Sequence, residues 1–246
     1  MVSKSEIKFL HSLNLLKCRN KQNLFKVEGW RSIKEFLSSD YKLINLFVSN
    51  DFLKNSNLLD SFSYKVVNQS ILNKISSLKS PSQTLAIFEK KTSSYNLLSL
   101  KKKLVIALED ISNPGNLGSI IRTADWFGIK HIFCSHNSVD LYNPKVIQST
   151  MGSLSRVNVV YLDLSKLIDN LKKEKFKLFA ADLNGSNFYN QKINNGIIFF
   201  GNESAGLSKK LSSKIINKIK VASKNSQCDS LNLSVSFGII VSEIVR

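Results

Sequence analysis

Short apolar runs alternate with longer segments of helical apolar spacing over the second part of the chain, from residue 103 onward. Continuous apolar runs are typical of buried strands, whereas apolar residues that recur every three or four positions are typical of amphipathic helices. The alternation predicts a mostly parallel sheet covered by helices on both faces, and therefore an α/β fold. The predicted strands span 103–108, 130–134, 157–161, 176–181, 196–200 and 218–222, and the predicted helices lie near 116–127, 143–151, 164–173, 207–215 and 230–245.

The first part of the chain repeats this alternation on a smaller scale and predicts a smaller α/β domain. Apolar residues near the start have helical spacing, and a basic, Asn-rich turn follows at 17–23. The other predicted elements are helices at 29–37 and 70–76 and strands at 25–28, 44–48, 65–67 and 84–89.

A polar segment rich in Lys and Ser separates the two parts at 90–102. Such composition is typical of a linker, and a short surface helix is the alternative. We therefore predict an α/β domain over 1–95, a linker over 96–102 and a larger α/β domain over 103–246.

The last predicted helix is apolar around most of its circumference, which is more than one core-facing stripe requires. We therefore predict a homodimer whose interface includes this helix. Its apolar residues are Leu231, Val235, Phe237, Ile239, Ile240, Val241, Ile244 and Val245.

The net charge of +17 changes the picture, because it favours a polyanionic partner such as RNA. Residues 1–95 hold 15 Lys and Arg against 7 Asp and Glu, and residues 96–246 hold 20 against 11, so the excess is not a basic tail. The alternative is an AT-rich genome that inflates Lys and Asn at the surface. The basic stretch from Lys17 to Lys26 is the first candidate for an RNA contact.

The three cysteines, Cys18, Cys134 and Cys228, are odd in number and widely spaced, without a metal-binding spacing. They favour a reducing cytoplasm over a secreted disulfide framework. The first residues lack the apolar core of a signal peptide, and no apolar run approaches the ~20 residues that cross a bilayer.

Candidate chemistry begins at Glu109, where the predicted strand 103–108 ends. A turn at Asn113–Asn116 leads into a helix that carries Arg122 and stops at Gly128, so strand, loop, helix and strand form a βαβ unit. Ligands of parallel sheets bind beyond the carboxyl ends of the strands. From the pattern alone, Arg122 is a surface residue paired with Asp125, and the two asparagines suit a turn and a helix N-cap.

Two later segments also place candidate residues after a predicted strand or at the start of a predicted helix. Gly201 directly follows the predicted strand 196–200, where glycine permits a close backbone approach, and Glu203 is favourable near the positive end of the next helix. Ser230 is a plausible N-cap of the last helix.

Residues 113–128, NPGNLGSIIRTADWFG, resemble the first signature motif of the SpoU/TrmH family of RNA ribose 2′-O-methyltransferases, in the SPOUT superfamily. Residues 200–207 and 229–236 resemble the second and third motifs in the same order, and motifs in context are far more specific than one alone. Residues 17–37 resemble, more loosely, the substrate-binding domain that precedes the catalytic domain in many members. The resemblance implies a deep trefoil knot, a homodimer, S-adenosylmethionine as methyl donor and no metal.

The resemblance also implies roles for individual residues. The catalytic set is Asn116, Arg122, Glu203, Ser230 and Asn232, and the cofactor-binding set is Ala181, Gly201, Asn202, Ala222 and Leu231.

Arg122 matches the family's catalytic arginine, but a guanidinium has no free acceptor with which to take a proton. We expect it to bind the adjacent RNA phosphate and to stabilise the developing alkoxide, which leaves the general base unassigned. The chain departs from the family at 221–228, which lacks the usual Pro and Gly before the third motif.

Three other readings compete with an rRNA methyltransferase. The RNA could be transfer RNA, since only the separate first domain favours ribosomal RNA, by analogy. The chain could be a non-catalytic assembly factor, but such a protein would lose some of the catalytic set. A dinucleotide-dependent oxidoreductase is disfavoured, because Gly115–Gly118 is not G-x-G-x-x-G and no ribose-binding acid follows strand 130–134.

Overall fold

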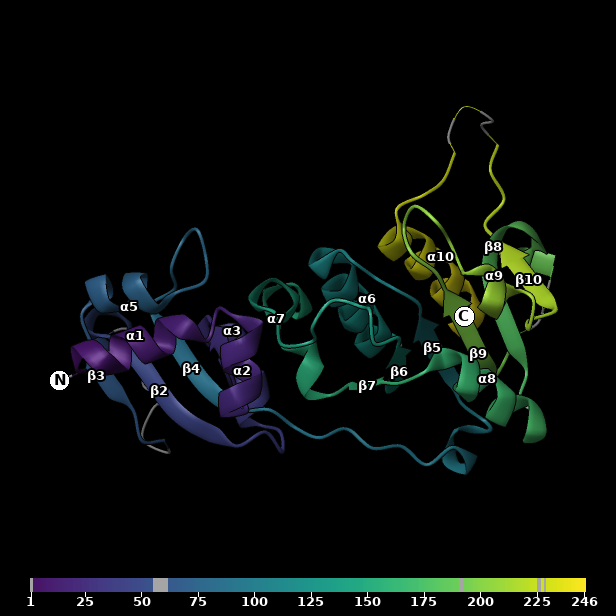
Figure 1. The fold of residues 1–246 in the computed structure, drawn as a ribbon. Coiled ribbons are helices and arrows are strands. Elements are labelled where there is room, and N and C mark those ends of the chain that lie inside the picture. Colours follow the sequence, from purple (N-terminus) through teal and green to yellow (C-terminus); the bar gives the residue numbers. More distant parts are fainter. Residues whose placement is uncertain (1, 55–61, 191–192, 225–226, 228) are drawn as a thin grey trace. The chain divides into compact units, whose positions relative to one another are not determined.

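A computed structural model describes residues 2–54, 62–190, 193–224, 227 and 229–246. The chain forms two compact units (Figure 1). Unit 1 comprises Met1–Thr92 and Asp140–Ser155, and unit 2 comprises Ser93–Val139 and Arg156–Arg246.

Unit 1 is built on a four-stranded mixed sheet in the order β1-β4-β2-β3, in which only β2 and β3 run parallel. Apolar residues of α1, α5, β2 and β4 share one core, as the alternating pattern predicts. The strands are β1 (Leu24–Glu28), β2 (Leu43–Ser49), β3 (Lys65–Val67) and β4 (Thr84–Glu89). The helices are α1 (Lys4–Ser12), α2 (Leu16–Gln22), α3 (Trp30–Leu37), α4 (Asn50–Lys54), α5 (Gln69–Ile75) and α7 (Pro144–Thr150).

Two local predictions for unit 1 are wrong. The basic segment expected to be a turn is helix α2, because its Lys, Arg and Gln residues are good helix formers. The helix ends at Asn23, whose left-handed φ of 57° is a common way to stop a helix. Helix α4 was not predicted.

The segment Asp140–Ser155 packs with Met1–Thr92 to complete unit 1. Asp140 accepts a hydrogen bond from Arg19 at 2.8 Å, and the Tyr142 ring lies 4.5 Å from the Phe25 ring, centroid to centroid. A Cβ atom at Gly152, where φ is +93°, would lie 2.6 Å from the Glu35 side chain. The spans 1–95, 96–102 and 103–246 stay a prediction, and the packing assigns Asp140–Ser155 to the earlier part of the chain.

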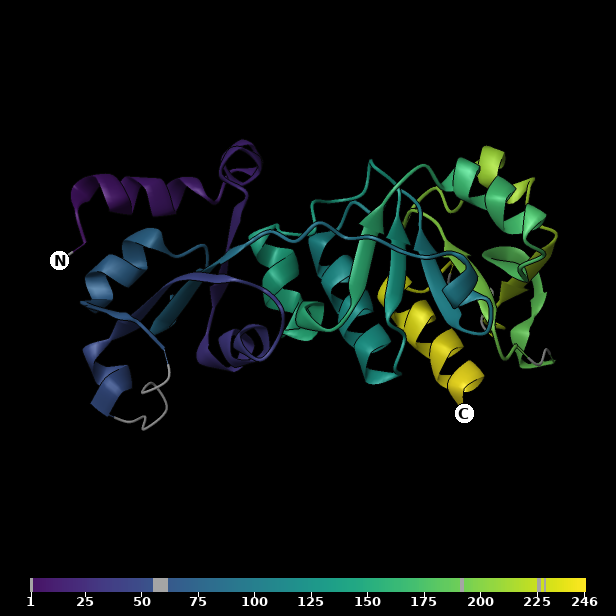
Figure 2. The same ribbon diagram turned by 90° about the horizontal axis from the view of Figure 1, so that it is seen from below.

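Unit 2 contains a six-stranded, all-parallel sheet in the order β10-β8-β9-β5-β6-β7. Its strands are β5 (Leu104–Leu108), β6 (His131–Cys134), β7 (Asn158–Tyr161), β8 (Leu178–Asn187), β9 (Gly196–Phe200) and β10 (Asn217–Lys220). Its helices are α6 (Pro114–Trp126), α8 (Leu164–Lys173), α9 (Lys209–Ser212) and α10 (Leu233–Val245), with short 3-10 turns at Leu98–Leu100 and Phe188–Asn190. Helices α6 and α10 lie side by side (Figures 1 and 2).

The strand order of unit 2 indicates where a ligand site is expected. From β5 the chain adds β6 and β7 on one side, and then β9, β8 and β10 lie on the other, so the order reverses between β5 and β9. Ligands of open parallel sheets bind beyond the carboxyl ends of the strands at such a reversal. The predicted α/β class is confirmed. The trefoil knot stays a prediction.

The N-caps of α6 and α10 differ from those expected. Asn113 caps α6, because its side chain accepts from the Gly115 amide at 2.8 Å and Pro114 suits the first helical position. Asn116 therefore lies inside the helix, buried, and not at its cap. Asn232, not Ser230, caps α10.

No helix in the described part of the chain has the length and apolar character that crossing a membrane demands. Cys18 and Cys134 are free thiols, and Cys228 lies outside the described residues. The cytoplasmic location stays a prediction.

Two of the four cations between Lys17 and Lys26 are buried, so the prediction that this stretch as a whole meets RNA is wrong. Arg19 is 2% exposed and donates to the Leu13 and Asn14 carbonyls as well as to Asp140. Lys26 is 4% exposed and donates to the Ile75 carbonyl at 2.6 Å. Lys17 and Lys21 remain exposed.

We predict that the free energy of unfolding rises as the pH increases above 8, because buried Lys26 then loses its proton in the folded state. Burial, aided by Arg19 and opposed by Glu28, lowers the pKa of Lys26 to about 8, against 10.5 for an exposed lysine. Below pH 8 both folded and unfolded chains hold the proton, so the folded state bears the cost of a buried cation. Between pH 8 and 10.5 the folded state loses the proton first, and the free energy of unfolding rises.

Urea unfolding at pH 7.5 and 9.5 measures this effect. The wild-type protein should gain about 2 kcal/mol more than Lys26→Met over this interval, since one pKa unit corresponds to about 1.4 kcal/mol. Comparing the two proteins cancels all other titrating groups. Equal gains in both would show that Lys26 is not the cause.

Candidate active site

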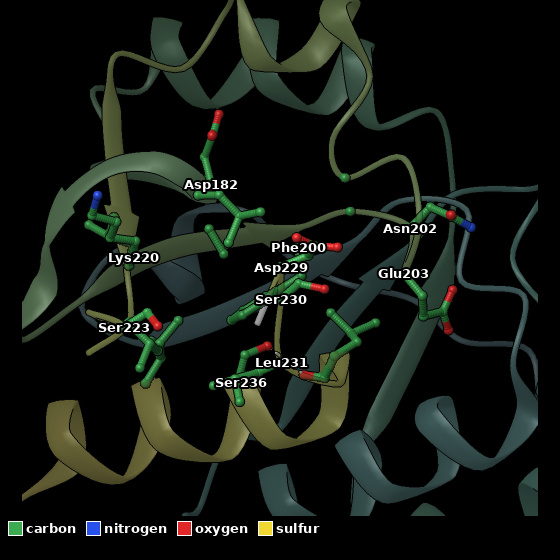
Figure 3. A pocket seen from close by; sticks show the side chains of 18 of the residues that line it. Asp182, Phe200, Asn202, Glu203, Lys220, Ser223, Asp229, Ser230, Leu231 and Ser236 are labelled. Atoms are coloured by element: carbon green, nitrogen blue, oxygen red, sulfur yellow. Dashed lines mark hydrogen bonds between the residues drawn. The ribbon is translucent and has the colours of Figure 1, made fainter. Parts of the chain in front are cut away.

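A pocket of about 300 Å³ opens beyond the carboxyl ends of β9 and β10 and beside the middle of β8 in unit 2 (Figure 3). Four stretches line it together with the first turns of α10. They are 181–183, 200–206, 219–223 and 229–231, with residue 205 not in contact. The pocket is therefore lined by residues of the second and third sequence motifs, 200–207 and 229–236.

The loop that follows β9 can only form with glycine at position 201. A Cβ atom there would lie 2.0 Å from the carbonyl carbon of Gly206 and 2.1 Å from the Leu207 nitrogen. The loop folds back because Asn202 and Gly206 exchange two backbone hydrogen bonds, of 3.0 and 2.9 Å. We expected Gly201 to allow close approach to a cofactor, and the loop itself already demands the glycine.

The side chain of Asn202 serves the same loop. Its Nδ2 donates to the Asp110 carbonyl at 2.9 Å, which ties the loop to the end of β5. Its Oδ1 accepts from the amides of Ser204 at 2.9 Å and Ala205 at 3.2 Å. Asn202 therefore contributes to the pocket by holding the loop in the shape that lines it.

A chain of three hydrogen-bonded side chains joins the three sequence motifs. Asn116 of α6 donates its Nδ2 proton to Glu203 Oε1 at 2.9 Å. Asn116 Oδ1 in turn accepts from Asn232 Nδ2 at 3.2 Å. Asn232 Oδ1 then accepts from the Ser234 amide, at 2.9 Å, and so caps α10.

The Glu203 carboxylate determines which groups donate and which accept along this series of hydrogen bonds. Burial opposes its ionisation, but hydrogen bonds from Asn116, from its own amide and the Asn113 amide, and from Ser112 outweigh burial and lower its pKa. A carboxylate only accepts, so Asn116 must present its amide group to Glu203 and its oxygen to Asn232. Glu203 is therefore an anchor and not a proton carrier at neutral pH.

Charged residues at the pocket were in part missed by the sequence reasoning. Asp182 lines the pocket and forms an ion pair with Lys218 at 3.0 Å. Burial raises the pKa of Asp182, but the Asn184 amide and Lys218 outweigh burial and lower it. Figure 3 shows Lys220 and Glu203 at opposite sides of the pocket. A carboxylate directly after the predicted cofactor residue Ala181 was the available signal.

The structure brings together nine of the ten predicted site residues. All five of the predicted cofactor set line the pocket, as do Glu203 and Ser230, while Asn116 and Asn232 reach it through Glu203. Arg122 does not line it. In the described part of the chain, no group of three His, Cys, Asp or Glu residues could hold a metal ion.

Arg122 is exposed on α6 and has no hydrogen bond or ion pair with any residue that the structure describes. The expected pair with Asp125 is wrong, because Asp125 pairs with Arg156 at 2.7 Å and with Lys130 at 3.4 Å. The guanidinium of Arg122 is therefore open to a ligand.

A parallel α/β sheet with a pocket beyond the carboxyl ends of β9 and β10, closed by the loop of residues 200–206 and by the last helix, defines the class of protein. Residues 103–242 match the SpoU rRNA Methylase family, and residues 4–86 match the MRM3-like substrate binding domain. The chain belongs to the SpoU/TrmH family and is an RNA ribose 2′-O-methyltransferase that depends on S-adenosylmethionine.

Individual relatives agree with this assignment. The chain is 27% identical over 238 residues to the 23S rRNA (guanosine(2553)-2′-O)-methyltransferase RlmP of Bacillus subtilis, covering 96% of this chain and 94% of that one. A putative RNA methyltransferase of the TrmH family from Porphyromonas gingivalis superposes with a TM-score of 0.88 at 28% identity, covering 99% and 98% of the two chains. An AdoMet-bound rRNA methyltransferase from Sinorhizobium meliloti shares the fold, with a TM-score of 0.85 at 24% identity and coverage of 99% and 96%.

Proposed function

We propose that this protein binds S-adenosylmethionine in the pocket of unit 2 and methylates a ribose 2′-hydroxyl of ribosomal RNA. The observation that carries the proposal is the convergence of all five predicted cofactor residues on one pocket, beside the Glu203–Asn116–Asn232 chain. The overall similarity to a 23S rRNA methyltransferase, over nearly the whole of both chains, supports ribosomal over transfer RNA.

The residues of the pocket fit this cofactor. Leu183, Leu231 and Ile240 offer apolar surface for an adenosyl group, whereas three carboxylates line the pocket against one lysine. An acidic lining in a protein of net charge +17 suits a cationic sulfonium. When bound, the cofactor supplies an electrophilic methyl group. The protein's part is to hold donor and acceptor in line and to exclude other orientations.

Arg122 lies six residues beyond Asn116, which is about 9 Å along the axis of α6. An unpaired guanidinium at that distance can bind the phosphate next to the target ribose with two parallel hydrogen bonds. It can also stabilise the negative charge that develops on the attacking oxygen.

We predict that Arg122→Ala lowers the rate of methyl transfer at least 100-fold, which is about 3 kcal/mol of transition-state stabilisation. The Kd for S-adenosylmethionine should stay within twofold, because Arg122 does not line the pocket. Calorimetry measures the affinity, and transfer of a tritiated methyl group to 23S rRNA from cells lacking the gene measures the rate.

Arg156→Ala is the matched control, since Arg156 is another exposed arginine of unit 2 and pairs with Asp125. It should retain normal turnover. Near-normal turnover in Arg122→Ala would refute the catalytic assignment, and preferential labelling of bulk tRNA would refute ribosomal RNA as the substrate.

We also propose that unit 1 holds the RNA through exposed cations, beginning with Lys17 and Lys21 of α2. Both lie on a seven-residue helix, and phosphate contacts of this kind give affinity without base specificity. A truncation near Leu100 is a poor test, because Tyr142 would lose its packing partner Phe25. Charge reversal in the full chain avoids this problem.

We predict that Lys17→Glu with Lys21→Glu weakens RNA binding and lowers the salt slope of log K by about 1 to 2, since roughly one counterion is released per phosphate contact. Lys172→Glu with Lys173→Glu, at the end of α8 in unit 2, applies the same charge change and is the control. Filter binding across a salt series measures both. Equal slopes in the two variants would remove α2 from the RNA-binding surface.

We further propose that the protein is a homodimer whose interface includes α6 and α10. Three large apolar side chains on these two packed helices lie open to solvent: Trp126 is 85% exposed, Val235 50% and Val245 47%. Exposed aromatic residues such as this tryptophan are enriched at protein interfaces.

We predict a dimer for the wild-type protein at micromolar concentration and a monomer for Val235→Glu, because a buried unpaired carboxylate at an interface is costly. Ile216→Glu is the control, since Ile216 is 91% exposed between α9 and β10. Sedimentation velocity distinguishes the two species. A wild-type monomer would contradict the proposal directly.

A further inference from the structure

Both ends of the loop that shapes the pocket are held by one residue, Glu109, at the end of β5. Where the loop leaves β9, the Glu109 amide donates to the Phe200 carbonyl at 2.8 Å. Where the loop ends, the Glu109 carboxylate accepts from the Ser208 amide and from the Ser208 hydroxyl, each at 2.7 Å. Glu109 is not among the residues that line the pocket.

The residue next to Glu109 holds the same loop at a third point. Asp110 adopts a left-handed φ of 54°, and its carbonyl accepts from the Asn202 side chain at 2.9 Å. The side chain of Asp110 accepts from the Ser135 hydroxyl at 2.7 Å, and the same hydroxyl oxygen accepts from the Asp110 amide. Ser135, the residue after β6, therefore fixes the strained backbone of Asp110, and this in turn holds the neighbouring Glu109 in a defined direction.

We propose that Glu109 is a positioning residue for the cofactor, acting through the loop of residues 201–207. This inference rests on the proposed cofactor pocket. Five loop residues line that pocket, namely Gly201, Asn202, Glu203, Ser204 and Gly206. Opening the Ser208 end frees the loop at its C-terminal side, and these five residues then lose their common arrangement.

The alternative is that Glu109 only stabilises the helix that starts after Ser208. That helix, α9, has four residues, and Ser208 already caps it by accepting from the Leu211 amide. A carboxylate with two bonds to the cap residue, and with its own amide bonded to β9, joins the loop ends to each other. This arrangement predicts an effect on cofactor affinity that a helix cap alone does not.

Three full-length variants test the proposal. Glu109→Ala removes both bonds to Ser208. Glu109→Gln can keep both, since its carbonyl accepts from the Ser208 amide and its amide donates to the hydroxyl oxygen. Asp163→Ala is the control, because Asp163 is a carboxylate that caps α8 in the same unit and does not line the pocket.

Calorimetric titration with S-adenosylmethionine and steady-state methyl transfer are measured for each protein. Glu109→Ala should raise both the Kd and the KM for S-adenosylmethionine at least tenfold and leave the KM for RNA within twofold. Glu109→Gln should restore the Kd to within threefold of wild type. Asp163→Ala should bind S-adenosylmethionine with the wild-type Kd, even if the variant unfolds at a lower temperature.

Equal cofactor affinity of Glu109→Ala and Asp163→Ala would overturn the proposal. So would a Glu109→Gln protein as weak as Glu109→Ala, because the hydrogen bonds would then not be the cause. A wild-type protein that fails to bind S-adenosylmethionine would refute the proposed pocket instead, so the two failures are distinguishable.

Discussion

The site depends on one constraint, which is that an ionised carboxylate accepts hydrogen bonds and never donates them. Glu203 therefore fixes which way the Asn116 amide points, and Asn116 fixes the Asn232 amide in the same manner. A primary amide alone is nearly symmetric and could be turned either way. With the carboxylate at one end and a helix cap at the other, only one arrangement satisfies every group, so α6, the loop after β9 and the start of α10 keep a common register.

Much of this arrangement could be predicted because parallel strands present their carboxyl ends at one edge of a sheet. Residues that follow β5, β9 and β10 must meet there, and this is why Asn116, Glu203 and Leu231 converge although they are far apart in the sequence. The apolar runs located the strands because both faces of this sheet are covered, and four of the five β5 residues and all five β9 residues are buried.

The sequence was less informative where a residue's role depends on a distant partner. Arg19 looked like a surface cation, because nothing nearby in the sequence announces Asp140 as its partner. Gly201 looked like a contact with a ligand, but its own loop, closing at Gly206, already excludes a side chain. Asn113 and Asn116 are both good capping residues, and only Pro114, which suits the first helical turn, decides between them.

The interleaved packing of unit 1 has a consequence for the order of events during synthesis. The ribosome delivers residues 1–92 first, yet unit 1 also contains Asp140–Ser155, and Arg19 must wait for Asp140, 121 residues later. In the interval a guanidinium that will be buried has only its carbonyl partners, and Phe25 lacks the ring of Tyr142. Domains generally fold as units while the chain grows, but here the first cannot be completed until strands β5 and β6 of the second have been made. Co-translational folding thus commits the chain to building both units together, and a nascent protein halted before residue 140 is an unfinished one.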